Sequence, residues 1–170
     1  MYDTAVPYPG HVAPLDHALQ CGAHAMAARA DDATIVAALF HDIGHLLLAD
    51  PSAPTVVRPE HDVVGARFLA NWFPDDVTYP VRLHVAARRY LTTIEPAAVH
   101  RNGNGSHAET VAPVSMTTSE ASAFQENPHW MVAVDLRRWD EASRVPGAPT
   151  PTMTVFRDIV IDVLRSSRPG

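Results

Sequence analysis

Apolar side chains recur at intervals of three and four residues along most of the chain, which is the spacing that places them on one face of an α-helix. In the segment that begins at Asp32, for example, Ile35, Leu39 and Ile43 share such a face. No segment has the alternation typical of a strand, so the pattern predicts an all-α fold. The expected helices span residues 14–29, 32–48, 59–73, 77–91, 118–126, 128–143 and 152–165.

Proline, glycine and polar residues mark the connections between these helices. Residues 92–116 are expected to form a long loop, because they are polar and contain an Asn-Gly-Asn-Gly turn signal. Residues 144–151 are expected to be a proline-rich linker to the last helix. Thr117 or Thr118, followed closely by an acidic residue, is expected to cap the helix after the long loop. We interpret residues 1–170, which contain no internal repeat, as a single domain.

Composition and charge narrow the class of protein. The chain is 46% hydrophobic and 19% charged, which is ordinary for a globular domain, and no run of apolar residues is long enough for a membrane span. The first residues lack the order of a signal peptide and Cys21 has no partner for a disulfide, so we expect a cytoplasmic protein. A net charge of −6 argues against nucleic acid as a partner and favours a small molecule. No lysine is present, which excludes lysine-dependent catalysis.

Histidine and aspartate within the apolar helices supply the candidate chemistry. His41 and Asp42 are adjacent in an apolar run, where a buried carboxylate is costly without a partner. A metal ion is one such partner, and a local polar pair is the simpler alternative. Imidazole nitrogen and carboxylate oxygen suit zinc, iron, manganese or nickel, whereas a structural zinc or iron–sulfur site would call for clustered cysteines, which the sequence lacks.

The remaining candidate ligands lie one on each of several other expected helices. Together with His41 and Asp42 they are enough for two octahedral metal ions that share the Asp42 carboxylate and keep open positions for water, oxygen or substrate. Asp135 competes with Asp140 for the last position. The candidate ligands are His17, His41, Asp42, His61, His84 and Asp140.

Five segments around these residues form a set: LDHALQ (15–20), LFHDIGH (39–45), HDVVGA (61–66), HVAARRYL (84–91) and LRRWDEA (136–142). This set resembles the HD-domain superfamily and, within it, the mixed-valence diiron oxygenases. The resemblance covers most of the chain. It implies a helical HD domain in which the six candidate ligands hold two iron ions, Fe(II) and Fe(III), with Asp42 bridging them, Asp140 completing the set and O2 as co-substrate. Members of this branch cleave the carbon–phosphorus bond of 1-hydroxy-phosphonates such as 2-amino-1-hydroxyethylphosphonate.

The resemblance also implies contacts to an organophosphonate substrate. His45 and Arg88 stand where the family has a histidine and a lysine that bind phosphonate, and Ser106 lies near the family's phosphonate-binding serine. Arginine keeps the charge of lysine but presents a planar fork. Tyr8 and His11 stand near a tyrosine that covers the iron and a glutamate that recognises the substrate's amine. Because histidine is a poorer partner for a cationic amine, we expect an uncharged or differently charged group there. The simpler interpretation of Ser106 is a solvated loop residue, and that of Tyr8 is a mobile N-terminal residue.

Three functional classes are compatible with these features. The preferred class is a diiron oxygenase that cleaves the C–P bond of a small 1-hydroxy-phosphonate and releases phosphate. The alternative is a metal-dependent HD phosphohydrolase, in which a metal-bound hydroxide attacks a small phosphate ester without any need for oxygen. A ligand-sensing module without turnover is the third class, and the complete set of candidate ligands counts against it.

Overall fold

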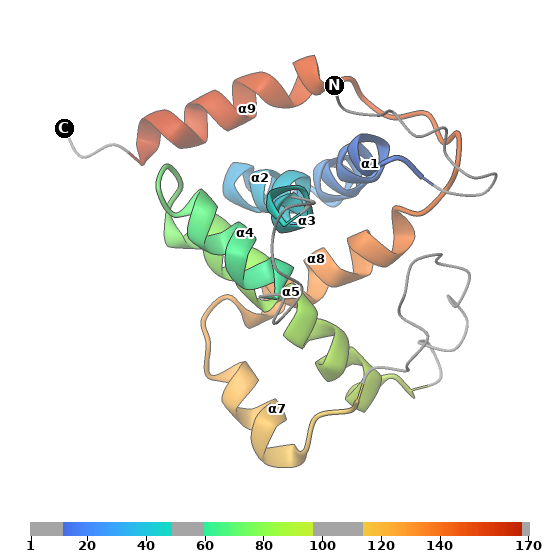
Figure 1. Ribbon diagram of the computed structural model, residues 1–170, viewed down its shortest axis with the longest axis vertical. Coiled ribbons are helices and arrows are strands. Elements are labelled where there is room, and N and C mark those ends of the chain that lie inside the picture. The colour runs from blue at the N-terminus through green and yellow to red at the C-terminus, as the bar shows by residue number, and fades with distance from the viewer. Residues whose placement is uncertain (1–11, 49–59, 97–113, 168–170) are drawn as a thin grey trace.

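The computed structural model describes residues 12–48, 60–96 and 114–167. Every regular element within these ranges is a helix, which confirms the all-α expectation. None of the described helices combines the length and apolar character needed to cross a bilayer. The helices are α1 (Pro14–Ala27), α2 (Asp32–Phe40), α3 (Ile43–Leu47), α4 (His61–Leu69), α5 (Asp75–Ile94), α7 (Thr118–Gln125), α8 (Trp130–Ala142) and α9 (Met153–Ser166) (Figure 1).

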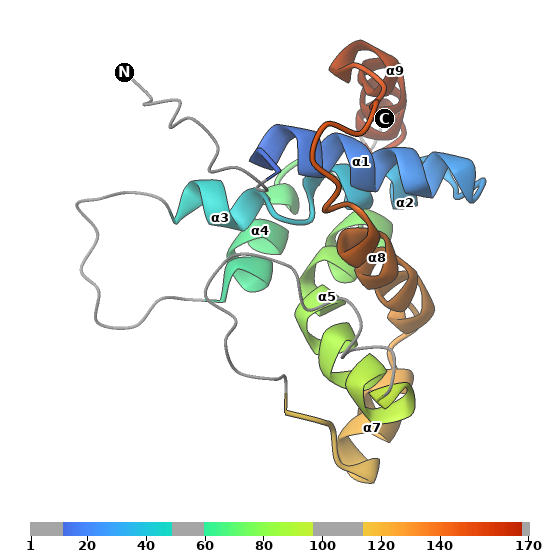
Figure 2. The same cartoon turned by 90° about the vertical axis from the view of Figure 1, so that its right-hand side faces the viewer.

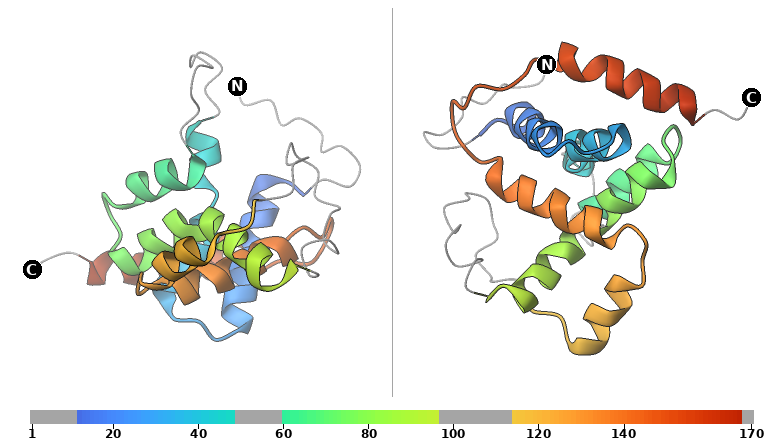
Figure 3. Two further views of the ribbon diagram at one scale, coloured as in Figure 1. Left: turned by 90° about the horizontal axis from the view of Figure 1, so that it is seen from below. Right: turned by 180° about the vertical axis from the view of Figure 1, so that it is seen from behind.

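Helix α5 lies at the centre of the packing. It contacts α2, α4 and α8, and α1 packs against both α2 and α8. Helix α9 lies along one edge of the molecule against α2, and α7 lies at the opposite end against α5 and α8 (Figure 1). The turned view shows the short α3 beside α4 (Figure 2). From behind, α8 runs between α1 and α5 (Figure 3).

Three groups of buried apolar side chains fix these helices relative to one another. One group, which includes Leu136 and Phe156, joins α1, α2, α8 and α9. A second, which includes Val36 and Val81, joins α2, α4, α5 and α9. The third contains Tyr90 and joins α5, α7 and α8. Because burial of each large apolar side chain contributes about 1.5–3 kcal/mol, these contacts hold the helices firmly enough to position polar groups between them.

The prediction of one continuous helix over residues 32–48 is wrong, because the structure has two helices there, α2 and α3, separated by His41 and Asp42. Asp42 has φ −96° and ψ 10°, a sparsely populated backbone region in which active-site residues are often found. The apolar periodicity did not reveal the break because Ile35 in α2 and Ile43 in α3 both face the core.

Other helix boundaries differ from the expectation by a few residues. The helix expected over 59–73 ends at Leu69, where the chain enters turns. Helix α5 begins directly after Pro74 and continues to Ile94, so the first residues of the expected 92–116 loop are helical, and residues 97–113 lie outside the described ranges. The cap of α7 is confirmed: Thr117 and Glu120 form a reciprocal capping box. The expected linker over 144–151 contains no helix.

Candidate metal centre

Four helices and the α2–α3 bend direct imidazole and carboxylate groups at one region of the interior. The side chains of His41, His84 and Asp140 are almost completely buried, whereas 33% of the Asp42 side chain remains exposed. All six candidate ligands predicted from the sequence are brought together here, and they fall into two groups.

The first group, called site 1 below, contains His17, His41 and Asp140. The Nε2 atom of His17 lies 3.3 Å from the Nε2 atom of His41 and 3.1 Å from Oδ1 of Asp140. The same Oδ1 is 3.8 Å from the Nε2 atom of His41. Asp42 faces this group with Oδ2, which is 3.6 Å from the Nε2 atom of His17 and 3.5 Å from that of His41.

The second group, called site 2 below, contains His61 and His84. Their Nε2 atoms are 3.0 Å apart. Asp42 faces this pair with its other oxygen, Oδ1, at 3.5 Å from His61 and 3.7 Å from His84. Since each oxygen of Asp42 faces a different pair of histidines, this one carboxylate is placed to bridge two metal ions.

The donor atoms fit metal ions in both chemistry and spacing. Two neighbouring ligands of an octahedral ion, each about 2.1 Å from the metal, lie about 3.0 Å apart, which matches the separations between the histidine nitrogens. The Nδ1 atoms of three histidines face backbone carbonyls, so the protonated Nδ1 donates and the lone pair of Nε2 points into the site. These contacts are His17 to Ser143 at 2.8 Å, His41 to Ala38 at 2.9 Å and His84 to Val81 at 2.6 Å.

The electrostatics of the two sites differ. Burial, with the charge of His45 in support, lowers the pKa of His61 to about 4, and burial with the charge of His41 lowers that of His84 to about 3. At site 1, burial disfavours the charged form of His41, but the charges and hydrogen bonds of neighbours, Asp42 first, raise its pKa well above the ordinary value. The pKa of Asp42 is lowered because His41 and other histidines outweigh its burial. Site 2 therefore offers neutral imidazoles, whereas binding at site 1 must displace a proton.

Two arginines that the sequence interpretation missed hold Asp140 in place. Nη1 of Arg137 donates to Oδ2 of Asp140 at 2.5 Å, and Nη2 of Arg144 donates to Oδ1 at 3.0 Å. Burial would raise the pKa of Asp140, but Arg137, followed by hydrogen bonds from His17 and His41, holds it well below its usual range. The sequence did contain a signal for these contacts: Arg137 and Arg144 are three and four residues from Asp140, a spacing that brings side chains together on a helix.

Two of the expected substrate-binding residues, His45 and Arg88, lie within the described ranges. His45 stacks on His61 with 3.8 Å between ring centroids, and its exposed ring places Nε2 3.9 Å from Oδ1 of Asp42, at the mouth of site 2. Arg88 is half-buried one turn after His84, and burial, followed by the charge of Arg137, lowers its pKa.

Three expected site residues, Tyr8, His11 and Ser106, lie outside the described ranges. Asp135, the competitor of Asp140 for the last ligand position, is 55% exposed and faces Arg138 at 3.6 Å. It belongs to neither group of candidate ligands, so the structure favours Asp140 for this position.

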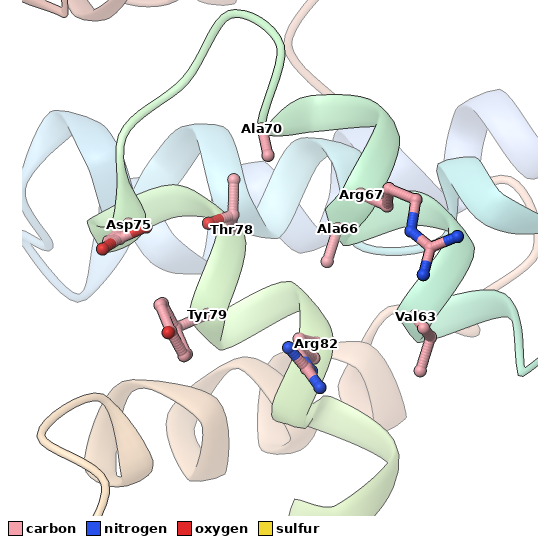
Figure 4. Close-up of a pocket in the computed structure, with 8 residues that line it drawn as sticks. All are labelled: Val63, Ala66, Arg67, Ala70, Asp75, Thr78, Tyr79 and Arg82. Atoms are coloured by element: carbon pink, nitrogen blue, oxygen red, sulfur yellow. The ribbon is translucent and has the colours of Figure 1, made fainter.

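A separate groove of about 280 Å³ lies between α4 and α5 (Figure 4). It is lined by small and polar side chains, among them Ala66, Thr78 and Tyr79, together with Arg67 and Arg82. Because no candidate ligand lines this groove, it is distinct from the metal centre.

Comparison with known proteins agrees with the geometry. The HD-domain family model matches residues 15–122. Hydroxymethylphosphonate dioxygenase of Gimesia maris is 36% identical over 166 residues, which cover 94% of this chain and 82% of the relative. The glycine-betaine-forming 1-hydroxy-2-(trimethylamino)ethylphosphonate dioxygenase of Leisingera caerulea is 33% identical over 129 residues, which cover 74% of this chain and 66% of the relative. The chain therefore belongs to the HD-domain family and, within it, to the oxygenase branch of phosphonate dioxygenase-like proteins.

Proposed function

We propose that this protein is a diiron oxygenase that uses O2 to cleave the C–P bond of a small 1-hydroxy-phosphonate and releases phosphate. The observation that carries the proposal is the position of Asp42, whose two oxygens face two separate pairs of histidines. Two adjacent ions that share this carboxylate would offer neighbouring open positions, one for O2 and one for the substrate. The names of both relatives, which describe a phosphonate with a hydroxyl on its phosphorus-bearing carbon, support the substrate class.

Seven donor atoms of the chain would hold the two irons. At site 1 these are Nε2 of His17 and His41 with Oδ1 of Asp140 and Oδ2 of Asp42, and at site 2 they are Nε2 of His61 and His84 with Oδ1 of Asp42. Octahedral ions held in this way keep open positions at both sites. When bound, an Fe(II)/Fe(III) pair supplies the electron transfer that O2 activation requires.

The proposed reaction is balanced without a further reductant. A 1-hydroxy-phosphonate, R–CH(OH)–PO3H2, and one O2 give the carboxylic acid R–COOH and phosphoric acid. The C–P, C–H and O–O bonds break, the carbon and the phosphorus each gain one oxygen atom, and the hydrogen of the carbon is released as a proton. The carbon is oxidised, and O2 is the only oxidant consumed. With hydrogen as R, hydroxymethylphosphonate would yield formate and phosphate, and we propose this small substrate, or one with a similarly uncharged substituent, as the preferred one.

Side chains around the metals would bind and orient the phosphonate. His45 lies at the mouth of site 2, 3.9 Å from Oδ1 of Asp42, and Arg88 on α5 lies close enough to Asp140 to interact with it electrostatically. A guanidinium group binds a phosphonate dianion through two parallel hydrogen bonds, which fixes the direction of the C–P bond as well as the charge. Because 33% of the Asp42 side chain is exposed to solvent, substrate and O2 would reach the two sites from this side.

The test is metal analysis of protein purified without oxygen, followed by O2 uptake on addition of hydroxymethylphosphonate and 2-amino-1-hydroxyethylphosphonate. We expect about two irons per chain and release of one phosphate for each O2 consumed, with hydroxymethylphosphonate the better substrate. Oxygen-independent hydrolysis of a generic phosphate ester with manganese or cobalt, together with no O2 uptake on either phosphonate, would overturn the proposal in favour of a phosphohydrolase.

A further inference from the structure

A buried glutamine on α1 holds the chain that follows α8. Gln20, which is 5% exposed, donates from Nε2 to the backbone oxygen of Val145 at 2.9 Å. Its Oε1 atom accepts from the backbone nitrogen of Val145 at 3.2 Å. Because one side-chain amide makes both contacts, it fixes the direction of the chain at Val145 as well as its position. Figure 2 shows this segment crossing α1.

Val145 is also the first residue of a tight turn. Pro146 and Gly147 occupy its two central positions, and the φ of 70° at Gly147 lies in the left-handed region that glycine adopts readily. The backbone nitrogen of Ala148 closes the turn by donating to the backbone oxygen of Val145 at 3.2 Å. Gln20 therefore attaches a defined turn, rather than a loose linker, to α1.

The attached segment contains the carbonyl that orients His17. The backbone oxygen of Ser143, two residues before Val145, accepts from Nδ1 of His17 at 2.8 Å. His17 and Gln20 are three residues apart on α1, so their side chains leave the helix on the same face. One turn of α1 thus carries a candidate ligand, and the next turn holds the segment that fixes the direction of that ligand.

The contacts of Ser143 with α8 do not replace this link. The hydroxyl of Ser143 donates to the backbone oxygen of Trp139 at 2.6 Å, and its backbone nitrogen donates to that of Asp140 at 3.2 Å. Both contacts tie Ser143 to α8 rather than to α1. Among the described residues, the hydrogen bonds that join this segment to α1 come from His17 and Gln20. If Gln20 were removed, the contact of His17 would be the one of these that remained.

We infer that Gln20 is a positioning residue for site 1, because it holds the Ser143 carbonyl where that carbonyl turns Nε2 of His17 toward the metal. The inference rests on the metal centre of the proposed function, but not on its substrate or reaction. A carbonyl that accepts from Nδ1 sets the tautomer and direction of a ligating histidine, and loss of such a partner typically weakens metal binding about 10–100-fold. Arg144 in the same segment donates to Asp140 at 3.0 Å, so Gln20 supports a second ligand of site 1 as well.

The test is calorimetric titration of the metal-free protein with Co²⁺, in which His41→Gln identifies the step that belongs to site 1. Gln20→Met has a side chain of similar length without the amide, and it should raise the Kd of site 1 about tenfold, at the lower end of that range, while the Kd of site 2 stays unchanged. Gln20→Asn keeps the amide but is one methylene shorter, so it should lose the contacts with Val145 and give the same result.

Gln125→Met is the matched control. Nε2 of Gln125 donates to the hydroxyl of Tyr90 at 2.6 Å from α7, a helix that contributes no candidate ligand among the described residues. This substitution also removes a glutamine hydrogen bond between two helices, and it should leave the Kd of both sites unchanged.

A second readout follows the hydrogen bond of His17 itself. In NMR spectra of Zn²⁺-loaded protein, the Nδ1 proton of His17 should exchange with solvent faster in Gln20→Met than in the native protein. The Nδ1 atoms of His41 and His84 face carbonyls one turn earlier in the chain, so the exchange of their protons should not change.

The inference would be overturned by a native Kd of site 1 in both Gln20 variants, or by unchanged exchange of the His17 proton. An equal rise of the Kd at both sites would also overturn it, because Gln20 would then stabilise the fold without acting on site 1 in particular. Binding of Co²⁺ and Zn²⁺ requires neither O2 nor a phosphonate, so failure of the proposed oxygenase reaction would be recognised separately by O2 uptake.

Discussion

Asp42 is the residue on which both candidate sites depend. Its backbone lies in a bridge-region conformation at the α2–α3 bend, and this conformation directs Oδ2 to site 1 and Oδ1 to site 2. A carboxylate this close to four histidines is stabilised in its charged form, as its lowered pKa indicates. Removal of the side chain would take one donor from each site at once.

Asp42→Ala should therefore lose both metals rather than one. The expected iron content falls from about two per chain to well below one, with helical circular dichroism retained because the packed apolar groups do not include Asp42. Asp135→Ala is the matched control, since Asp135 is exposed and outside both sites, and it should keep two irons. Two tightly held irons in Asp42→Ala would contradict the bridging role.

The two sites should also respond differently to acid. Neutral imidazole binds metal, and an ordinary histidine, with a pKa of about 6.5, is mostly protonated at pH 5.5. The lowered pKa values of His61 and His84, about 4 and about 3, keep these residues in the binding form at that pH. The raised pKa of His41 means that protons compete for site 1 already near neutrality.

Acidification from pH 7.5 to 5.5 should therefore weaken site 1 before site 2. The measurement is calorimetric titration of the metal-free protein with Co²⁺ at a series of pH values, with His41→Gln to identify the pH-sensitive step. Simultaneous loss of both sites with a midpoint near 6.5 would show that the environments of the histidines do not differ in this way.

At the scale of elements, the close approach of α3 to α4 builds site 2. A methyl group at Gly44 would lie 1.9 Å from the backbone oxygen of His61, and one at Gly65 would lie 3.2 Å from the backbone nitrogen of Gly44. Only glycine permits the two backbones to come this near. The approach brings the ring of His45 onto that of His61 and sets His61 opposite Asp42.

Gly44→Ala should push α3 away from α4 and remove the metal of site 2. We expect about one iron per chain and a loss of stability of about 1–3 kcal/mol in urea unfolding, which is typical of overpacking. Gly22→Ala is the control: its new methyl would meet the Phe156 ring at 2.8 Å, a side chain that can shift, so two irons should remain. Full iron content in Gly44→Ala would mean that α4 is positioned by other contacts.

Across the whole chain, the candidate metal ligands come from helices that are far apart in the sequence. Site 1 connects α1, α2 and α8, and site 2 connects α4 and α5, with Asp42 common to both. Ions bound at the two sites would therefore add cross-links between helices that the apolar groups already hold together. Any ion that binds only the folded state must stabilise it.

Removal of the metals should lower the melting temperature. At free metal concentrations about 1,000 times the Kd, one bound ion contributes about 4 kcal/mol, which corresponds to a shift of about 10 °C for a chain of this size. The measurement is calorimetric melting with and without a chelator. Asp42→Ala protein is the control and should not respond, whereas an equal melting temperature of native protein in both conditions would contradict the cross-linking role.

The helical class and the cap of α7 could be predicted from the sequence alone, as could the types of candidate ligand. These features are local: periodicity, the Thr117 capping signal and the His41-Asp42 pair are each contained within a few turns of chain. The resemblance of short motifs then identified the family to which the comparisons also assign the chain. The exact helix ends were less predictable, because the packing of neighbours decides whether a last turn forms.

How these parts meet depends on contacts between residues that are distant in the sequence. The break at Asp42 was hidden because both halves of the expected helix keep apolar faces toward the core. Asp135 and Asp140 lie on one helix about 140° apart, so the partners of α8, rather than its own pattern, bury one and expose the other. The roles of Arg137 and Arg144 depend on where Asp140 points, which is set by contacts between residues distant in sequence.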